Sequence, residues 1–246
     1  NVVYFRVTIL VMSLETSELE TGYFATSFRV VEVLIGIPAL FIGAAYPILA
    51  GAERDDDARF AYAMRRILEL SMILGVWMAM CCAVGAQVAI DVLAGGDAQP
   101  AVAVLRIQGL TLIATGIAVA AGYGLPTLRR YAALLWLNAG ALAASVVLTL
   151  LLVGPLGAEG GAIATLATES AMAVGVVAVL LRLRPELAGM LRAVVPVFAA
   201  GGAAVAAGLL AGLPALVALV AANAVFVAGL AVTRRLPPEI RDVLRR

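Results

Sequence analysis

The sequence predicts an all-α integral membrane protein with about eight transmembrane helices, the first of them truncated. Of its 246 residues, 63% are hydrophobic and 13% are charged, and the mean hydropathy is +1.06. Because water-soluble domains carry about 25% charged residues, the chain lacks the polar surface that a water-facing globule needs. Composition therefore argues against a soluble enzyme, a secreted disulfide scaffold, a disordered chain and a nucleic-acid binder.

The apolar segments predict one partial and seven complete spans. Residues 2–14 are too few to cross a bilayer, which takes about 20 residues. We expect them to be the end of a helix whose beginning is missing, and the chain to be a fragment of a longer protein. Each of the other segments can cross about 30 Å of hydrocarbon at about 1.5 Å per residue. They are residues 23–50, 67–94, 101–125, 131–153, 160–181, 193–211 and 215–232.

Arginine in the connections predicts the orientation. All 17 basic residues are arginine, and 14 of them fall in alternate connections, while the connections between these contain none. The arginine-rich connections are residues 51–66, 126–130, 182–192 and 234–246. Because cytoplasmic loops carry the excess of basic residues, these connections and the C-terminus are predicted to be cytoplasmic. Residues 58–66 and 236–246 are amphipathic, and each is predicted as either an interfacial helix or a solvated juxtamembrane stretch.

Ionisable side chains inside the predicted spans are the candidate functional residues, because charge at membrane depth is costly and faces a bundle interior or a watery cavity. Arg6, Arg29, Arg106 and Glu169 are predicted to lie about 9–14 Å below the outer surface, counting 1.5 Å per residue. Arg29 and Glu32 are three residues apart and can share a helix face. Such a positive set predicts an outer cavity that attracts phosphate or pyrophosphate, whose oxygens match forked guanidinium donors. The alternative is a structural Arg29–Glu32 pair, with Arg6 and Arg106 reaching to the membrane surface.

Helix-breaking residues interrupt the first complete span. They are Gly36, Pro38, Gly43 and Pro47. Proline inside a helix removes a hydrogen bond and kinks the helix, and such breaks often mark the transporter elements that bend during alternating access. These four residues are therefore the predicted hinge, and a kink without motion is the alternative.

The sequence offers little for catalysis. It contains no His, no Lys and only two cysteines, the adjacent Cys81 and Cys82, which are interpreted as buried apolar residues. Without a cluster of metal-ligand residues or a phosphate-binding Gly-rich loop, no metal and no cofactor is expected. The sequence favours a membrane transporter over an enzyme.

Three stretches resemble the C-terminal half of Wzx-type oligosaccharide flippases. Residues 22–50 (GYFATSFRVVEVLIGIPALFIGAAYPILA) are similar to a family segment that opens with Gly-Tyr, carries an Arg-x-x-Glu-like pair and ends at Pro before a basic loop. Residues 154–169 (GPLGAEGGAIATLATE) resemble the family's Gly-Ala-x-Gly-Ala-Ala-Ile-Ala-Thr segment and its following Glu. Residues 101–113 (AVAVLRIQGLTLI) resemble its Ala-x-x-Leu-x-Ile-x-x-Leu segment. Order and spacing agree over about residues 4–181.

The resemblance implies a MATE-like bundle of two six-helix halves, of which this chain holds the second. On that template, residues 1–181 form a six-helix bundle with a partial first helix, residues 182–233 form two additional helices, and residues 234–246 form a cytoplasmic tail. Many relatives carry an Asp near the position of Thr8, so ion coupling through that site is not implied here.

The resemblance also implies a function. The protein would flip a polyprenyl-pyrophosphate-linked oligosaccharide across the bacterial cytoplasmic membrane by alternating access, for polysaccharide biosynthesis. The substrate-binding residues would be Arg6, Arg29, Glu32, Arg106 and Glu169, with the arginines meeting the pyrophosphate. Expected partners are the lipid-linked oligosaccharide, membrane lipids, and glycan polymerases or glycosyltransferases, but no nucleic acid.

Two other functions stay open. A cation-coupled multidrug antiporter of the same superfamily would use a buried acid as its key group, whereas the predicted cavity of this chain contains more arginine than acid. A non-transporting membrane scaffold for glycan polymerases would have no need of charges at matched depth.

Overall fold

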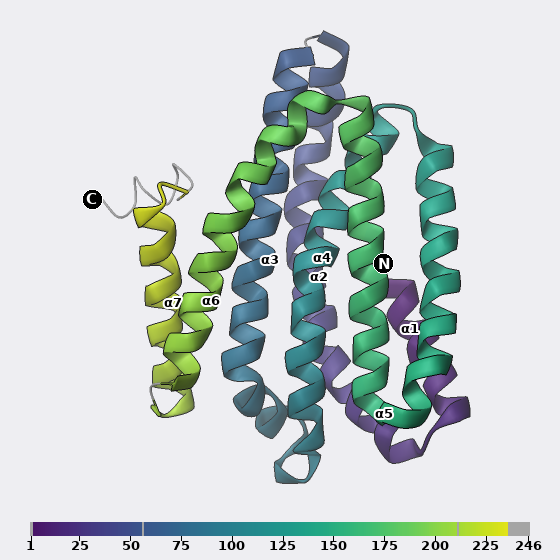
Figure 1. Ribbon diagram of the computed structural model, residues 1–246, viewed down its shortest axis with the longest axis vertical. Coiled ribbons are helices and arrows are strands. Elements are labelled where there is room, and N and C mark those ends of the chain that lie inside the picture. The colour runs from purple at the N-terminus through teal and green to yellow at the C-terminus, as the bar shows by residue number, and fades with distance from the viewer. Residues whose placement is uncertain (1, 56, 211, 236–246) are drawn as a thin grey trace.

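The chain folds as a bundle of long helices that run side by side along one axis (Figure 1). The computed structural model describes residues 2–55, 57–210 and 212–235, and within them it contains no strand. Its α-helices are α1 (Val2–Glu15), α2 (Glu18–Asp55), α3 (Asp57–Ala94), α4 (Pro100–Thr127), α5 (Tyr131–Leu183), α6 (Val194–Leu210) and α7 (Ala215–Val232). The short 3₁₀ helices η1 (Gly96–Ala98) and η2 (Pro185–Ala193) precede α4 and α6. The predicted all-α class is confirmed.

Helices α2 and α3 are longer than predicted. Each has 38 residues, or about 57 Å at 1.5 Å per residue, and together they form a hairpin that rises above the neighbouring helices (Figure 1). Residues 58–66, predicted as either an interfacial helix or a solvated juxtamembrane stretch, are the first turns of α3, and their position relative to the membrane stays a prediction. Phe60 and Met64 are fully buried and pack with Leu187 of η2, which makes the segment part of the core. The amphipathic stretch predicted at residues 236–246 lies outside the described residues.

Helix α5 contains two limbs that run in opposite directions (Figure 1). The chain reverses at Gly157, whose φ of 54° and ψ of −132° are not helical, so the predicted spans 131–153 and 160–181 become the two limbs. Beyond the reversal, the backbone N–H of Ala158 donates to Glu20 Oε2 of α2 at 2.7 Å. A Cβ on residue 157 would overlap that carboxylate. Gly157 is therefore required by both its backbone angles and the close approach of Glu20.

Five described helices are long and apolar enough to cross a membrane. They are residues 58–94, Pro100–Thr127, Tyr131–Leu183, residues 185–210 and Ala215–Val232. The figure of about eight spans stays a prediction.

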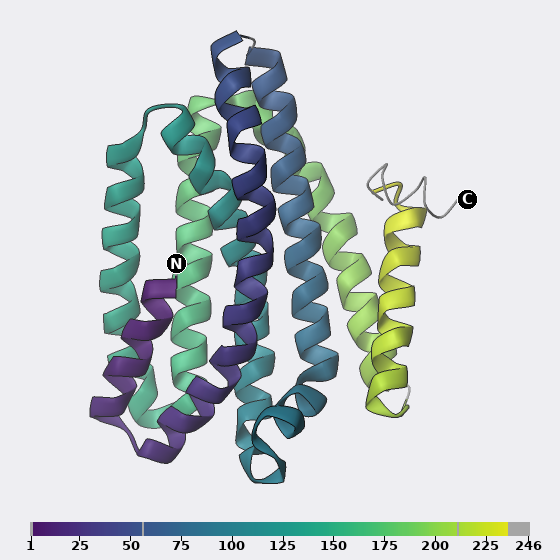
Figure 2. The same ribbon diagram turned by 180° about the vertical axis from the view of Figure 1, so that it is seen from behind.

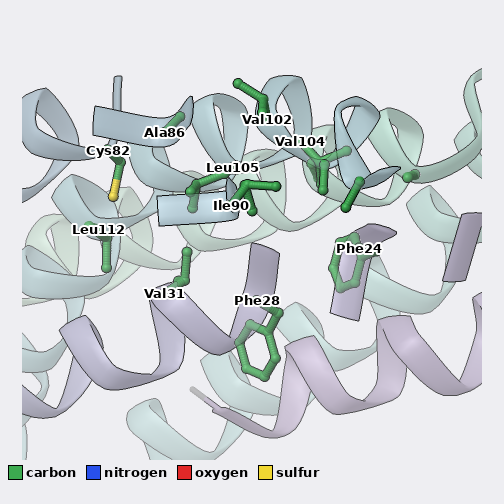
Figure 3. Packing of buried hydrophobic residues seen from close by; sticks show 14 of the residues in the cluster. Phe24, Phe28, Val31, Cys82, Ala86, Ile90, Val102, Val104, Leu105 and Leu112 are labelled. Atoms are coloured by element: carbon green, nitrogen blue, oxygen red, sulfur yellow. The ribbon is translucent and has the colours of Figure 1, made fainter. Parts of the chain in front are cut away.

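The α2 side of the core joins residues of α1, α2, α3, η1, α4 and α5. Phe24 and Val31 of α2 are buried against Leu105 and Leu112 of α4, with Cys82 of α3 in the same cluster, as Figure 3 shows. Cys82 is 4% exposed, which confirms its interpretation as a buried residue, whereas Cys81 is only partly buried. Because α4 supplies this cluster and also a second one shared with α5, it lies at the centre of the bundle.

Helices α6 and α7 form a third cluster with α3, at the side of the bundle (Figures 1 and 2). A polar contact fixes α7 there, because the indole Nε1 of Trp77 in α3 donates to Asn223 Oδ1 at 2.7 Å. The Asn223 amide also donates to the Leu219 carbonyl at 2.8 Å. The two hydrogen bonds together satisfy both the oxygen and the N–H group of the Asn223 side chain, which would otherwise be costly to bury in apolar surroundings.

The arginine-rich connections all lie at one end of the bundle. The α2–α3 hairpin, the α4–α5 connection and η2 are at the top in Figure 1, the end of α7 is in its upper half, and the other connections are at the bottom. The predicted alternation of basic and non-basic connections thus corresponds to the two ends of the molecule. Which end faces the cytoplasm stays a prediction.

Replacing Gly157 by Ala should destabilise the fold. A side chain at this backbone conformation costs about 1–3 kcal/mol, and its Cβ would displace Glu20 from the Ala158 N–H. We expect a lower midpoint of thermal unfolding. Intrinsic tryptophan fluorescence of the purified protein measures this midpoint. Gly154→Ala is the matched control, because a Cβ there meets nothing within 4 Å. Equal midpoints for the two variants would contradict this explanation of the reversal.

Candidate functional site

An ion pair joins α1 to α2 on an open face of the bundle. Arg6 Nη2 donates to Glu32 Oε1 at 2.8 Å, and the two side chains are 69% and 38% exposed. The predicted structural pair between Glu32 and Arg29 is not the one formed. Helices α1 and α2 are antiparallel neighbours, so Arg6 reaches Glu32 from the adjacent helix at the same level. Glu32 therefore bridges two helices and does not pair within its own.

Arg29 belongs to an exposed stripe of α2. Its members are Arg29, Val33, Gly36, Leu40 and Gly43, a spacing that places them on one face of a helix. Among the described residues Arg29 forms no ion pair. The stripe is therefore uncovered by the described chain, and it carries one guanidinium whose charge is not compensated. We call this stripe, together with Arg6 and Glu32, the α2 face.

The predicted hinge lies along the same helix. Helix α2 is helical at Gly36, Pro38, Gly43 and Pro47, and the side chain of Pro47 lies outside the description. A Cβ on Gly36 or Gly43 would meet nothing within 4 Å. Packing within the described chain therefore gives no reason for glycine at these two positions.

The structure does not bring Arg106 to the α2 face. Ser27 Oγ of α2 donates to Gln108 Oε1 of α4 at 2.9 Å, so these two side chains point toward each other. Arg29 and Arg106 each lie two residues away from that contact, or about 200° around the helix. Both are exposed, and they face opposite sides of the α2–α4 pair. They lie at similar levels, each about 3 Å along its helix from the contact, but they do not converge.

Glu169 lies in a third place, enclosed between α4 and the second limb of α5. Its side chain is 0% exposed, and Thr115 Oγ1 of α4 donates to Glu169 Oε2 at 2.9 Å. A buried carboxylate needs such partners, because leaving it unsatisfied in an apolar medium is costly. The structure therefore separates Glu169 from the exposed arginines.

Sequence reasoning missed the uncharged polar contacts between helices. The Thr8 hydroxyl of α1 lies 3.4 Å from Ser145 Oγ and 3.5 Å from Thr149 Oγ1, both on the first limb of α5, and all three side chains are fully buried. Hydroxyl and amide groups of this kind link membrane helices. The sequence signal that could have predicted these contacts is a polar residue within an apolar segment, on the side of the helix that faces its neighbours, such as Gln108.

Comparisons with known proteins place the fold. No protein-family model and no curated protein matches the chain. Among solved structures, lipid II flippase MurJ in an inward closed conformation matches with a TM-score of 0.71 and 13% identity, over 94% of this chain and 50% of that one. The chain thus spans half the length of that structure. At this identity the likeness shows the fold alone, which is the fold of the matched half of that structure.

The contact between Thr115 and Glu169 should contribute to stability. Thr115→Val removes a donor from a buried carboxylate oxygen, which should cost about 1–3 kcal/mol and lower the midpoint of thermal unfolding. Thr168→Val is the control, since the Thr168 hydroxyl is also buried but donates at 2.8 Å to Ala164 O of its own helix. If Thr168→Val lowers the midpoint as much as Thr115→Val does, the contact between Thr115 and Glu169 adds no stability beyond that of any buried hydroxyl.

Proposed function

We propose that the protein is a flippase that carries a polyprenyl-pyrophosphate-linked oligosaccharide across the bacterial cytoplasmic membrane. The observation that carries this proposal is the α2 face, where exposed Arg29 lies one helical turn from the Arg6–Glu32 pair. The MurJ-like fold and the three segments similar to Wzx-type flippases support the same class of activity. Fold and apolar helices favour a transporter over an enzyme.

The α2 face suits a pyrophosphate for reasons of charge and geometry. The Arg29 guanidinium is exposed and has forked N–H donors that match phosphate oxygens. Arg6 supplies a second guanidinium, which Glu32 holds in position at 2.8 Å. The carboxylate also lowers the net charge of the face to one positive charge, which favours release of the anion after transfer.

Arg106 and Glu169 take other roles in this proposal. Arg106 faces away from α2, so we leave it outside the pyrophosphate site. Glu169 is enclosed with Thr115, and we assign it to holding α4 against α5. The substrate site proposed in this chain therefore consists of Arg6, Arg29 and Glu32.

Alternating access would bend α2 near Gly36 and Gly43. Glu20, Ser27 and Glu32 of α2 form polar contacts with other elements, and all three precede Gly36. The first half of α2 is thus tied to α1, α4 and α5. The second half begins where the helix-breaking residues lie, and it is the half that we expect to swing.

The remaining assignments follow from this proposal. The arginine-rich end and the C-terminus face the cytoplasm by the excess of basic residues. Residues 1–181 form the transport bundle, residues 182–233 two additional helices, and residues 234–246 a cytoplasmic tail. Glycan polymerases or glycosyltransferases are the proposed protein partners, because they make or use the oligosaccharide.

Arg29→Gln should abolish most transport without affecting the fold. Losing charge-assisted hydrogen bonds costs about 1.5–3 kcal/mol, which corresponds to about 10- to 100-fold weaker binding. The assay is translocation of labelled lipid-linked oligosaccharide in proteoliposomes that contain the full-length protein. Arg29→Lys should keep part of the activity, and Arg130→Gln, at an exposed arginine of the α4–α5 connection, should keep all of it.

Other outcomes of that assay identify the alternatives. Full transport by Arg29→Gln would refute the role of the α2 face. Gradient-driven efflux of an organic cation, with no oligosaccharide transport by the wild type, would assign the protein to the antiporter class. A scaffold would transport neither substrate.

Replacing Gly36 and Gly43 together by Ala should slow transport but stabilise the protein. Ala favours a helix by about 1 kcal/mol over Gly, and neither Cβ meets an atom within 4 Å. Substrate binding should be unchanged, and thermal unfolding should occur at a higher temperature. Gly202→Ala in α6 is the control, since its Cβ also meets nothing within 4 Å. Normal transport by the double variant would disprove the hinge. The proposed binding site would not be contradicted by that result.

A further inference from the structure

A second site lies on the opposite side of α4. A cavity of about 190 Å³ opens between α3, the second limb of α5, and the junction of η2 with α6. Its apolar walls include Leu68, Met72, Ile117, Val174, Val177 and Leu191. Ile117 follows Gln108 by nine residues, or about two and a half turns, so it points away from α2. The cavity is therefore separate from the α2 face.

The cavity is open to the outside of the bundle. Val174 is 69% exposed and Leu191 is 50% exposed, and they belong to the two elements that border the opening. Because these helices are apolar enough to cross a membrane, we expect lipid chains around this opening. An acyl chain is the molecule that matches both the apolar wall and this position.

One acid lines the cavity, and two arginines outside its lining are paired with that acid. Glu69 is the charged residue in its wall, and its carboxylate lies 3.5 Å from Arg66 Nη1 and 3.7 Å from Arg235 Nη1. Arg235 Nη2 also donates to the Arg192 carbonyl at 3.2 Å. The Glu69 side chain is 12% exposed, whereas Arg66 and Arg235 are 41% and 31% exposed.

The balance of charge and donors around Glu69 favours an added anion. Two guanidiniums share one carboxylate, which leaves one positive charge uncompensated. Each guanidinium has five N–H donors, and the contacts of Arg66 and Arg235 use only some of them. A phosphate diester beside both arginines would take the remaining donors. Basic pockets between membrane helices at the cytoplasmic side bind anionic headgroups in this way.

We propose that this site holds an anionic phospholipid, with one acyl chain in the cavity and its phosphate on Arg66 and Arg235. The lipid would join α3, α5 and the segment after α7. Glu69 competes with the phosphate for the same guanidinium donors, so it sets the affinity of the site. The proposal does not depend on what the α2 face transports.

Lipid retention by the full protein in detergent tests the proposal. Native mass spectrometry would count bound phosphatidylglycerol and phosphatidylcholine of identical acyl chains. We expect phosphatidylglycerol to be retained preferentially, and each arginine lost to weaken its binding about fivefold. Arg66→Gln with Arg235→Gln should therefore remove the preference, and Arg130→Gln, at the same end of the bundle, should keep it. Retention of both lipids to the same extent by the wild type would overturn the proposal.

Two further variants separate lipid binding from a purely structural ion pair. Glu69→Gln should increase phosphatidylglycerol retention, because it frees the donors of both arginines, whereas a structural role predicts no gain. Val174→Trp should reduce retention by blocking the opening, and its exposed position allows the larger ring without disturbing the core. A phosphatidylglycerol with a photoreactive acyl chain should label the peptide that contains Val174 and Val177. Unchanged retention in Val174→Trp, or labelling spread evenly over all helices, would refute the site.

Discussion

In the hydrocarbon of a membrane, a backbone N–H or C=O group has no water to bond with. Each such group must therefore be satisfied within the protein, which restricts spanning segments to helices or closed barrels. This constraint accounts for the architecture, because every apolar segment becomes a helix and the connections are short. It also leaves side chains as the main source of specificity between helices, since lipid tails are as apolar as leucine.

Under that constraint, a few polar contacts decide how the helices fit together. Ser27 with Gln108, and Thr115 with Glu169, hold α2 and α5 to the central α4. Trp77 with Asn223 does the same for α7 and α3. Each contact satisfies groups that would otherwise be buried alone, so each also selects one rotation of its helix about its axis. The faces left exposed, including the α2 face, are a consequence of these choices.

Much of this fold could be predicted from the sequence, because membrane helices follow from hydropathy and length alone. The predicted span 215–232 coincides with α7 (Ala215–Val232), and the two limbs of α5 agree closely with the predicted spans 131–153 and 160–181. The long α2–α3 hairpin was not predicted, because residues 58–66 mix arginine with apolar residues. Their burial depends on contact with η2, a segment distant in the chain.

The sequence predicted how far along their helices the candidate site residues lie, but not the side of the helix from which each side chain projects. Counting residues from the loops placed Arg29 and Arg106 at similar depth, and the Ser27–Gln108 contact supports that. The direction of each side chain depends on the rotation of its helix, which the count does not contain. For the same reason, spacing within α2 suggested Arg29 as the partner of Glu32, whereas the antiparallel neighbour brings Arg6 to it.

The length of α2 gives its bending a mechanical consequence. From Gly43 to its end at Asp55, α2 extends about 18 Å, and α3 runs beside it in the hairpin. A tilt of about 10° at Gly43 would displace the tip by about 3 Å on this geometry. If α2 bends at Gly43 as proposed, the hairpin is a lever arm that converts a small change beside Arg29 into a larger displacement of its tip.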